Sequence, residues 1–155
     1  MRYNAYLSLG SNLGNREENL RQAISLLEER AGKVISRSAF YYTEPWGFES
    51  VNGFVNNCIA LQTDLDPEAL LLATQEIERE LGRLKKSDGS YSDRMIDIDI
   101  ILIDGIMIDT PLLKVPHPLM HLREFVLAPL REIAPDLKHP VLVKSIDELT
   151  KLLEK

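Results

Sequence analysis

The sequence predicts an α+β protein with a ferredoxin-like βαββαβ core, a mostly antiparallel sheet with helices packed in an α/β/α sandwich, an extra hairpin strand and C-terminal helices. The first observation is the order of the hydrophobic periods, which runs strand, helix, strand, strand, helix, strand. The second is size: 155 residues, of which 45% are hydrophobic and 27% charged, suit one globular core. We therefore expect residues 1–155 to form a single domain.

The first strand and helix are marked by their hydrophobic spacing and their ends. Alternating apolar residues predict a strand that begins at Tyr3 and is ended by Gly10. Apolar residues at helical spacing then predict a helix, for which Asn15 and Glu18 are the expected cap and its partner and Gly32 is the stop.

Two strands are expected next, over residues 33–43 and 53–63, because both segments are rich in β-branched and aromatic residues. The connection between them is long for a hairpin loop and contains three large apolar residues, Pro45, Trp46 and Phe48. Two interpretations remain: the loop closes over a ligand, or it packs back on the core.

The second helix and the strand after it follow the same signals. Asp66 and Pro67 predict the start of a helix that ends at Gly82, since a capping residue precedes a proline at the first helical position. The segment SDRMIDIDIIL, residues 92–102, has Ile or Leu at five of its eleven positions, which predicts a strand in the middle of the sheet.

The remaining elements are a hairpin and two helical segments. Asp104-Gly105 between apolar triplets predicts a two-residue hairpin with a short returning strand. A loop leading into a helix is expected within residues 116–135, and Ser145 with Glu148 predicts a capping box on a terminal helix.

Charge and cysteine content narrow the class of partner. The net charge of −6 and pI near 5.1 argue against a broad nucleic-acid or anionic-membrane surface, so we expect small-molecule partners. We also expect a monomer. No targeting segment or apolar run of membrane-spanning length is visible. Cys58 is the only cysteine, which excludes an internal disulfide and fits a cytoplasmic location.

Two aspartates, Asp97 and Asp99, interrupt the apolar strand. Because side chains alternate along a strand, both carboxylates face one side, with Cα atoms roughly 7 Å apart. At an effective dielectric near 20 they repel each other by roughly 3 kcal/mol, so we expect something to compensate. Three interpretations remain: a solvated or edge-protecting face, a salt-bridge network with Arg83, Arg94 or Arg123, and a divalent metal that also holds substrate phosphates.

Basic residues around the acid pair favour the metal interpretation. They are Arg83, Lys85, Lys86 and Arg94 before it and His117, His121 and Arg123 after it. A polyphosphate site needs such cations, because the metal neutralises some phosphate oxygens and Arg or Lys binds others. A zinc site at His117 and His121 is disfavoured because prolines interrupt that segment. The segment GSNLGNRE lacks the Gly-Lys-Ser/Thr ending of a P-loop, so a bound ATP would be held by metal and arginine.

Six motifs follow one another along the chain: LSLGSNLGNREENL, FYYTEPWGF, GFVNNCIAL, ELGR, SDRMIDIDIIL and VPHPLMHLREFVLAPLREIAP. In this order and spacing they resemble the 6-hydroxymethyl-7,8-dihydropterin pyrophosphokinases of folate biosynthesis, from about residue 3 to 137. The most specific part is R-x-x-D-x-D followed by P-H-P and R-x-F. The resemblance implies an enzyme that transfers pyrophosphate from ATP to the hydroxymethyl group of the pterin and releases AMP.

The resemblance also implies a role for individual residues at the phosphates. Asp97 and Asp99 would hold two Mg²⁺ ions, and Arg83 and Arg94 would assist catalysis. The positions that match the ATP site are Gln75, Glu78, Lys86, Tyr91, Ile100, Lys114, His117 and Arg123.

For the pterin, the resemblance implies stacking between Phe54 and Phe125. Its polar edge would contact Asn56 and the backbone around Thr43, Glu44 and Trp46. Without the resemblance, the two phenylalanines would be interpreted as core aromatics and Asn56 as a half-buried strand residue.

The chain departs from the family pattern at Ser90, Tyr91, Leu112, Lys114 and Pro118. These departures concern loop closure and ATP affinity and leave the reaction in place. Two other functions would have different products: an ordinary kinase would form ADP, and a binding module that senses a nucleotide or metal would form no product.

Overall fold

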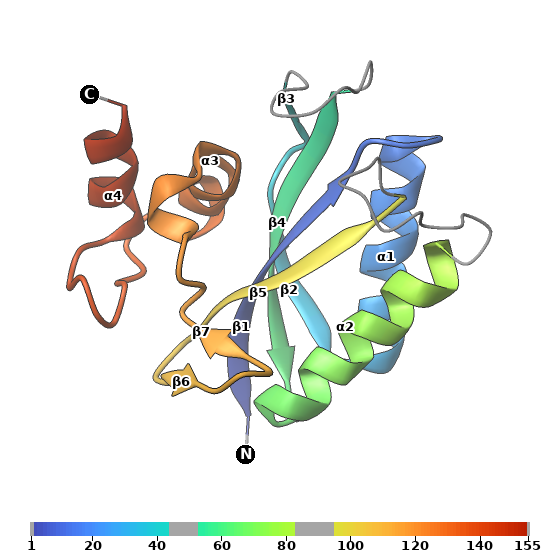
Figure 1. The fold of residues 1–155 in the computed structure, drawn as a ribbon, viewed down its shortest axis with the longest axis horizontal. Helices are drawn as coiled ribbons and strands as arrows, with labels where there is room; N and C mark the ends of the chain where they lie inside the picture. Colours follow the sequence, from blue (N-terminus) through green and yellow to red (C-terminus); the bar gives the residue numbers. More distant parts are fainter. Residues whose placement is uncertain (1, 44–52, 83–94, 155) are drawn as a thin grey trace.

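The computed structural model describes residues 2–43, 53–82 and 95–154, which build a sheet with helices on both sides. Two helices, α1 (Arg16–Arg30) and α2 (Pro67–Gly82), cover one face (Figure 1). On the other side lie α3 (Glu124–Ile133) and, outside it, α4 (Ile146–Leu153). The predicted sandwich of helices around a sheet is confirmed.

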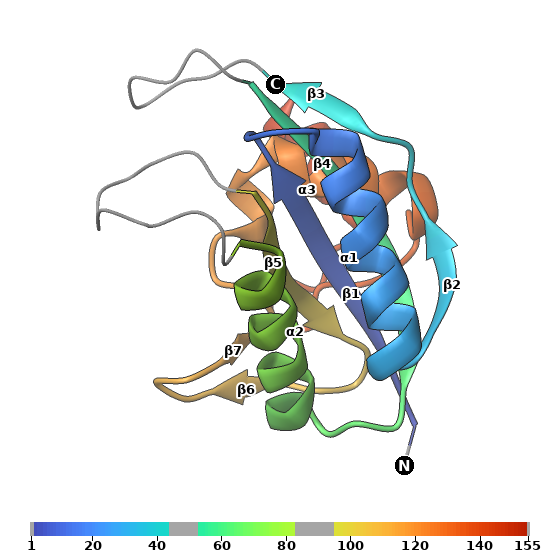
Figure 2. The ribbon, with the colours of Figure 1, turned by 90° about the vertical axis from the view of Figure 1, so that its right-hand side faces the viewer.

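In the part of the chain that the structure describes, the main sheet is antiparallel and has five strands. They are β1 (Tyr3–Ser11), β2 (Lys33–Arg37), β3 (Tyr41–Thr43), β4 (Phe54–Thr63) and β5 (Asp97–Ile103). The order is β2-β4-β1-β5, and β3 also pairs with β4. Because β4 lies between β1 and β2, which α1 connects, the arrangement is the split βαβ of the ferredoxin-like fold (Figure 2).

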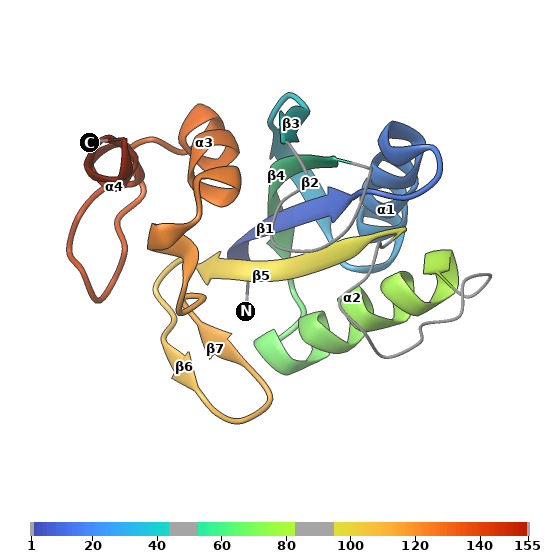
Figure 3. The ribbon, with the colours of Figure 1, turned by 45° about the horizontal axis from the view of Figure 1, so that its top comes forward.

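Each face of the sheet has its own hydrophobic core. On the side of α1 and α2, Leu7 and Ile59 are among the fully buried residues, and on the side of α3 and α4, Met120 and Leu127 are. Figure 3 shows the two helical layers on opposite sides of β1, β4 and β5. Among the described residues, no helix has the length and apolarity to cross a bilayer.

Two strand boundaries differ from the prediction. Residues 33–43 form two strands, because Ser38 leaves the regular ladder and bonds Cys58 with both its backbone N–H (2.9 Å) and its hydroxyl (3.0 Å). The first strand does not end at Gly10 but continues to Ser11, since β4 and β5 both pair with Gly10.

The prediction that β5 lies in the middle of the sheet is wrong, because among the strands of the described residues it pairs with β1 alone and occupies an edge. Its apolar composition has another cause: Ile98 faces the core under α2 and Ile101 faces the core under α3. The outer edge is covered locally. The N–H of Ile98 donates to a Glu78 carboxylate oxygen (2.7 Å), and the carbonyl of Ile101 accepts from the N–H of His117 (2.8 Å).

The predicted hairpin at Asp104-Gly105 is also wrong. A turn is present, but β6 (Ile108–Asp109) pairs with β7 (Lys114–Val115) in a separate two-stranded sheet. Gly105 has a positive φ of 79°, whereas Asp104 does not. Since a type I′ hairpin turn needs a positive φ at both central residues, this turn directs the chain away from β5.

The helix caps agree with the prediction. The Asn15 side chain accepts a hydrogen bond from the Glu18 N–H (3.2 Å) at the start of α1. Ser145 and Glu148 form both bonds of a capping box on α4. The expected loop and helix of residues 116–135 are a short 3₁₀ helix, Met120–Leu122, followed by α3.

Candidate active site

Three neighbouring strands place one residue each in a row across the sheet. Gly10 of β1 lies opposite Asn56 of β4 on one side and opposite Asp97 of β5 on the other. Because adjacent strands are about 4.8 Å apart, Asn56 and Asp97 are separated by roughly 10 Å across Gly10. Directly opposite residues point to one face, so an amide and a carboxylate flank a position without a side chain.

This row faces α3. Cys58 lies two residues beyond Asn56 in β4 and therefore points to the same side, where its Sγ is 3.6 Å from the carbonyl oxygen of Val126 in α3. On β5, Asp97 and Asp99 share this side, because Ile98 between them is buried in the opposite core.

Gly10 is a residue of the candidate site that the sequence prediction missed. A Cβ atom built at this position would lie 2.7 Å from Asn56 Oδ1 and 3.6 Å from Phe54 Cδ1. Glycine therefore lets the Asn56 amide and the Phe54 ring lean over β1. The signal was available, because a glycine inside a strand often marks a close approach of backbone to a neighbour or a ligand.

Asn56 offers a hydrogen-bond donor to this space. Its side chain is only 7% exposed, and among the described residues its buried Nδ2 has no hydrogen-bond partner. An unsatisfied buried donor costs about 1–3 kcal/mol, so a ligand with an acceptor at this position would be stabilised. Asn56 is also the residue at which the family resemblance predicts a polar contact to the pterin.

Carboxyl groups gather at the other end of the row. Asp97 and Asp99 are half-buried on β5, and Glu78 of α2 reaches the same edge and hydrogen bonds with Asp97. Burial raises the pKa of Glu78 above its usual range, the N–H of Ile98 opposes this shift, and Asp97 and Asp99 add to it. The concentration of negative charge is the environment that a divalent cation would relieve.

The donor set suits Mg²⁺ better than a closed structural metal site. Among the described residues, no three His, Cys, Asp or Glu side chains are placed to hold one ion together. Mg²⁺ in phosphate-transfer sites is usually held by one or two carboxylates, with waters and substrate phosphates as the other ligands. Asp97 and Asp99 fit that requirement.

Two basic side chains lie on the same side of the site. Burial lowers the pKa of His117, Arg123 lowers it further, and Asp97 opposes the shift. Its Nδ1 accepts a hydrogen bond from the Leu119 N–H (3.2 Å), so the neutral ring carries its proton on Nε2. His117 is therefore a neutral donor beside the aspartates, and Arg123 is a permanent cation.

Aromatic residues border the row on two elements. Phe54 begins β4, where it pairs with Thr43 of β3, and Phe125 lies in the first turn of α3. Both rings are half-buried, and the guanidinium of Arg123 lies 5.6 Å from the centroid of the Phe125 ring. The structure thus places Thr43, Phe54 and Asn56 at one end of the site.

Other predicted site residues lie elsewhere in the fold. Gln75 is exposed on α2, and Ile100 is 5% exposed in the core on the opposite face from the aspartates. Lys114 belongs to β7, and its Nζ is 2.6 Å from Asp109. A further group lies outside the described residues: Glu44, Trp46, Arg83, Lys86, Tyr91 and Arg94.

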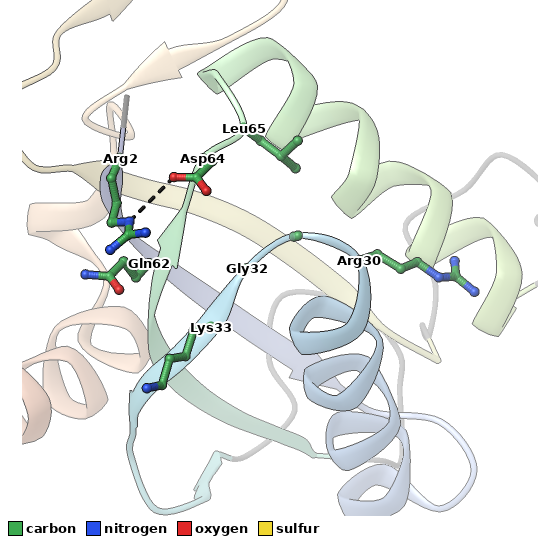
Figure 4. A pocket seen from close by; sticks show the side chains of 8 residues that line it. Arg2, Arg30, Gly32, Lys33, Gln62, Asp64 and Leu65 are labelled. Carbon is green, nitrogen blue, oxygen red and sulfur yellow. Dashed lines mark hydrogen bonds and ion pairs between the residues drawn. The ribbon is translucent and has the colours of Figure 1, made fainter.

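A separate cavity of about 440 Å³ lies at the far end of the sheet, where Arg2, Arg30, Lys33 and Asp64 are among the lining residues (Figure 4). Its charges are largely compensated. Arg2 is 3.5 Å from Asp64, and Arg30 points away from the cavity to an ion pair with Glu80 (2.7 Å). This cavity lacks the carboxylate pair and the aromatic rings of the row on β1, β4 and β5.

Comparisons with known proteins identify a family. Residues 6–135 match the family described as 7,8-dihydro-6-hydroxymethylpterin-pyrophosphokinase (HPPK). A protein of Porphyromonas gingivalis, named 2-amino-4-hydroxy-6-hydroxymethyldihydropteridine pyrophosphokinase, is 51% identical over 137 residues, which cover 87% of this chain and 92% of the relative. A protein of the same name from Bacillus subtilis is 45% identical over 83% of this chain and 77% of its own length.

Solved structures are similar in fold. The crystal structure of Plasmodium falciparum HPPK-DHPS with pteroate matches with a TM-score of 0.78 and 18% sequence identity over 98% of this chain. The match covers 42% of that chain, so the protein studied spans less than half of this structural relative. At this identity the likeness supports the ferredoxin-like arrangement of strands and helices.

Proposed function

Because this chain belongs to the 7,8-dihydro-6-hydroxymethylpterin-pyrophosphokinase family, we propose that it transfers the β- and γ-phosphates of ATP together to 6-hydroxymethyl-7,8-dihydropterin. It is an ATP-dependent pyrophosphokinase of folate biosynthesis that releases AMP. The observation that carries this proposal in the structure is the row in which Asn56 and Asp97 flank Gly10. It offers a site for a planar heterocycle at one end and for phosphates at the other.

The pterin would lie over Gly10, where no side chain intrudes. Phe54 and Phe125 would stack on its two faces, and Asn56 Nδ2 would donate to an acceptor on its edge. Further polar contacts would come from the backbone around Thr43, Glu44 and Trp46. With the edge held at Asn56, the hydroxymethyl group would point along the row toward Asp97.

The triphosphate would lie beside β5. Asp97 and Asp99 would hold two Mg²⁺ ions, which supply charge neutralisation for the phosphate oxygens and orient them. His117 would donate from Nε2 to a phosphate oxygen, and Arg123 would supply a cation. Glu78 would position Asp97 through the hydrogen bond between their carboxyl groups.

Other residues are assigned by the family resemblance alone. Arg83 and Arg94 would bind the phosphates as charge develops during transfer. The remaining nucleotide contacts would come from Gln75, Lys86, Tyr91 and Lys114, and from the backbone of Ile100, because its side chain is buried in the opposite core.

The reaction needs positioning rather than a covalent enzyme intermediate. The pterin hydroxyl oxygen forms a bond to the β-phosphorus of ATP while the bond from that phosphorus to the oxygen of the α-phosphate breaks. Holding the pterin edge at Asn56 and the triphosphate at Asp97, the two ends of one rigid row, would bring the hydroxyl oxygen and the β-phosphorus into line. We also propose that the protein acts as a monomer in the cytoplasm, where ATP is available.

The product of ATP tests this proposal. Purified protein with MgATP and 6-hydroxymethyl-7,8-dihydropterin is expected to form AMP and the pterin diphosphate in equal amounts, as measured by anion-exchange chromatography. ADP as the stoichiometric product would identify an ordinary kinase. Stable ligand binding without product over hours would identify a binding module.

A further inference from the structure

Two side chains outside the proposed site, Tyr41 of β3 and Glu132 of α3, connect the sheet to the helix that bears Phe125. The Tyr41 hydroxyl donates to Glu132 Oε1 at 2.7 Å. Both oxygens of the same carboxylate lie 3.2 Å from the N–H of Ala39, which donates to them. Burial raises the pKa of Tyr41 to about 12, and the Glu132 carboxylate adds to the shift, so the phenol is a donor at neutral pH.

Tyr41 extends the row of Asn56, Gly10 and Asp97 by one strand. In the ladder between β3 and β4 it lies directly opposite Asn56. Side chains in such pairs have Cβ atoms about 4.5–5.5 Å apart and point to the same face. Asn56 is therefore flanked by Gly10 on one side and by the Tyr41 side chain on the other.

The Asn56 amide depends on these neighbours for its orientation. Its Nδ2 has no hydrogen-bond partner among the described residues, so hydrogen bonding of that atom does not fix the orientation of the amide. On the β1 side, Asn56 Oδ1 occupies the space over Gly10, because it lies 2.7 Å from the position that a Cβ atom would take. On the β3 side, the Tyr41 side chain can limit movement of the Asn56 amide only if it is itself fixed. The hydrogen bond to Glu132 fixes it.

Glu132 also influences the position of Phe125 relative to the sheet, because both residues belong to α3. The helix packs on the sheet mainly through apolar side chains such as Leu127 and Leu130, whose contacts are not directional. Pro129 lacks the N–H that would bond the carbonyl of Phe125 in a regular helix. The directed bonds of Glu132 to Tyr41 and Ala39 therefore fix the helix against β3, close to the row.

We infer that Tyr41 and Glu132 are positioning residues for the pterin, which hold the Asn56 amide and the Phe125 ring in register with each other. This inference rests on the proposed function, because it assumes that the pterin lies between these two groups. Neither residue touches the reacting atoms. The pair acts mainly on pterin affinity, through both Asn56 and Phe125, because Arg123 at the start of α3 is the one residue by which it also reaches the phosphate end of the row.

The chain contains a matched control in the next residue. Tyr42 is on the opposite face of β3, and its hydroxyl donates to Glu17 Oε2 of α1 at 2.9 Å. Tyr41→Phe and Tyr42→Phe each remove one exposed tyrosine–glutamate hydrogen bond to a helix. Only the first bond reaches the helix that bears Phe125.

The test is to measure KM for the pterin and for MgATP, together with the pterin dissociation constant by calorimetry, in the parent and three variants. Tyr41→Phe is expected to weaken pterin binding about fivefold, as the loss of one exposed hydrogen bond of typical strength would do, with a smaller change in KM for MgATP. Tyr42→Phe is expected to match the parent. Glu132→Gln keeps an oxygen acceptor and is expected to lie between the parent and Tyr41→Phe.

The outcomes separate this inference from the proposed function. If the parent forms AMP but Tyr41→Phe and Glu132→Gln bind pterin as the parent does, the positioning role is wrong and the proposed function stands. Equal losses for pterin and MgATP, or equal losses in Tyr41→Phe and Tyr42→Phe, would also overturn the role, since they indicate general destabilisation. A parent that neither binds the pterin nor forms AMP would refute both.

Discussion

Asn56 and Asp97 lie on opposite sides of Gly10 in one row that crosses three strands of the sheet. The strand spacing fixes the distance between them, and hydrogen-bonded backbone makes that spacing rigid. An enzyme that joins a heterocyclic alcohol to a phosphate needs such a fixed separation, because small displacements of reacting atoms cost large factors in rate.

The space over Gly10 is expected to be essential for the pterin. In Gly10→Ala the new methyl group would lie 2.7 Å from Asn56 Oδ1 and would displace the amide. We expect KM for the pterin to rise roughly tenfold or more, as expected for the loss of a directed hydrogen bond and part of the stacking surface, with KM for MgATP unchanged.

Gly82→Ala is the control for this substitution. Among the described residues, no atom beyond the helix's own backbone lies within 4 Å of a Cβ built at Gly82, so the pterin KM should be that of the parent. An unchanged pterin KM in Gly10→Ala would show that the pterin does not lie over β1.

The two aspartates are expected to be dispensable for folding and required for turnover. Asp97→Asn and Asp99→Asn each remove a negative charge from a crowded site, so the melting temperature should stay the same or rise. Steady-state AMP formation should fall by roughly 100-fold or more in each, as it does when a charged group that stabilises a transition state is removed.

Asp64→Asn provides the comparison, because the Asp64 side chain is 75% exposed at the far end of the sheet. It should retain full activity. Near-normal turnover in Asp97→Asn or Asp99→Asn would contradict the assignment of two metal ions. Full activity with higher stability in both would favour the interpretation that the pair is merely a solvated, repulsive face.

Cys58 is expected to be unreactive in the folded protein. Its burial raises the pKa of the thiol to about 12, and the Ser8 hydrogen bond opposes this only in part. The raised pKa means that the stabilising contribution of the protonated thiol is fully present below the ordinary cysteine value and is lost as the pH rises toward 12. Between those values the unfolded thiol ionises first, so the free energy of unfolding should fall.

Alkylation with iodoacetamide at pH 8.5 measures this directly. The labelling rate of Cys58 should be negligible in buffer and should rise along the urea unfolding curve followed by circular dichroism. Rapid labelling before the unfolding transition would show that the contact between β4 and α3 opens in the native state.

The sequence was sufficient to predict the order of elements and most of their ends. Caps such as Asn15 and Ser145 act within one helical turn, so their signals are local and reliable. The position of β5 could not be predicted in the same way. A strand at an edge looks apolar when helices cover both its faces, and Glu78 and His117, which cover its free edge, are distant in sequence.

The candidate site was predicted unevenly for a related reason. Asp97 and Asp99 are visible because charge is unusual in an apolar strand. Gly10 was interpreted as a strand end, since its role depends on the registers with Asn56 and Asp97, which only pairing reveals. The link from Tyr41 to Glu132 joins residues 91 positions apart and has no sequence signal.

A crystal structure with 6-hydroxymethyl-7,8-dihydropterin and a non-hydrolysable ATP analogue with Mg²⁺ tests the central claim most directly. We expect the pterin ring over Gly10, its edge within hydrogen-bonding distance of Asn56 Nδ2, and its hydroxymethyl group directed toward metal ions on Asp97 and Asp99. A pterin bound elsewhere, such as in the cavity lined by Arg2 and Asp64, or metal ions that do not contact either aspartate, would contradict it.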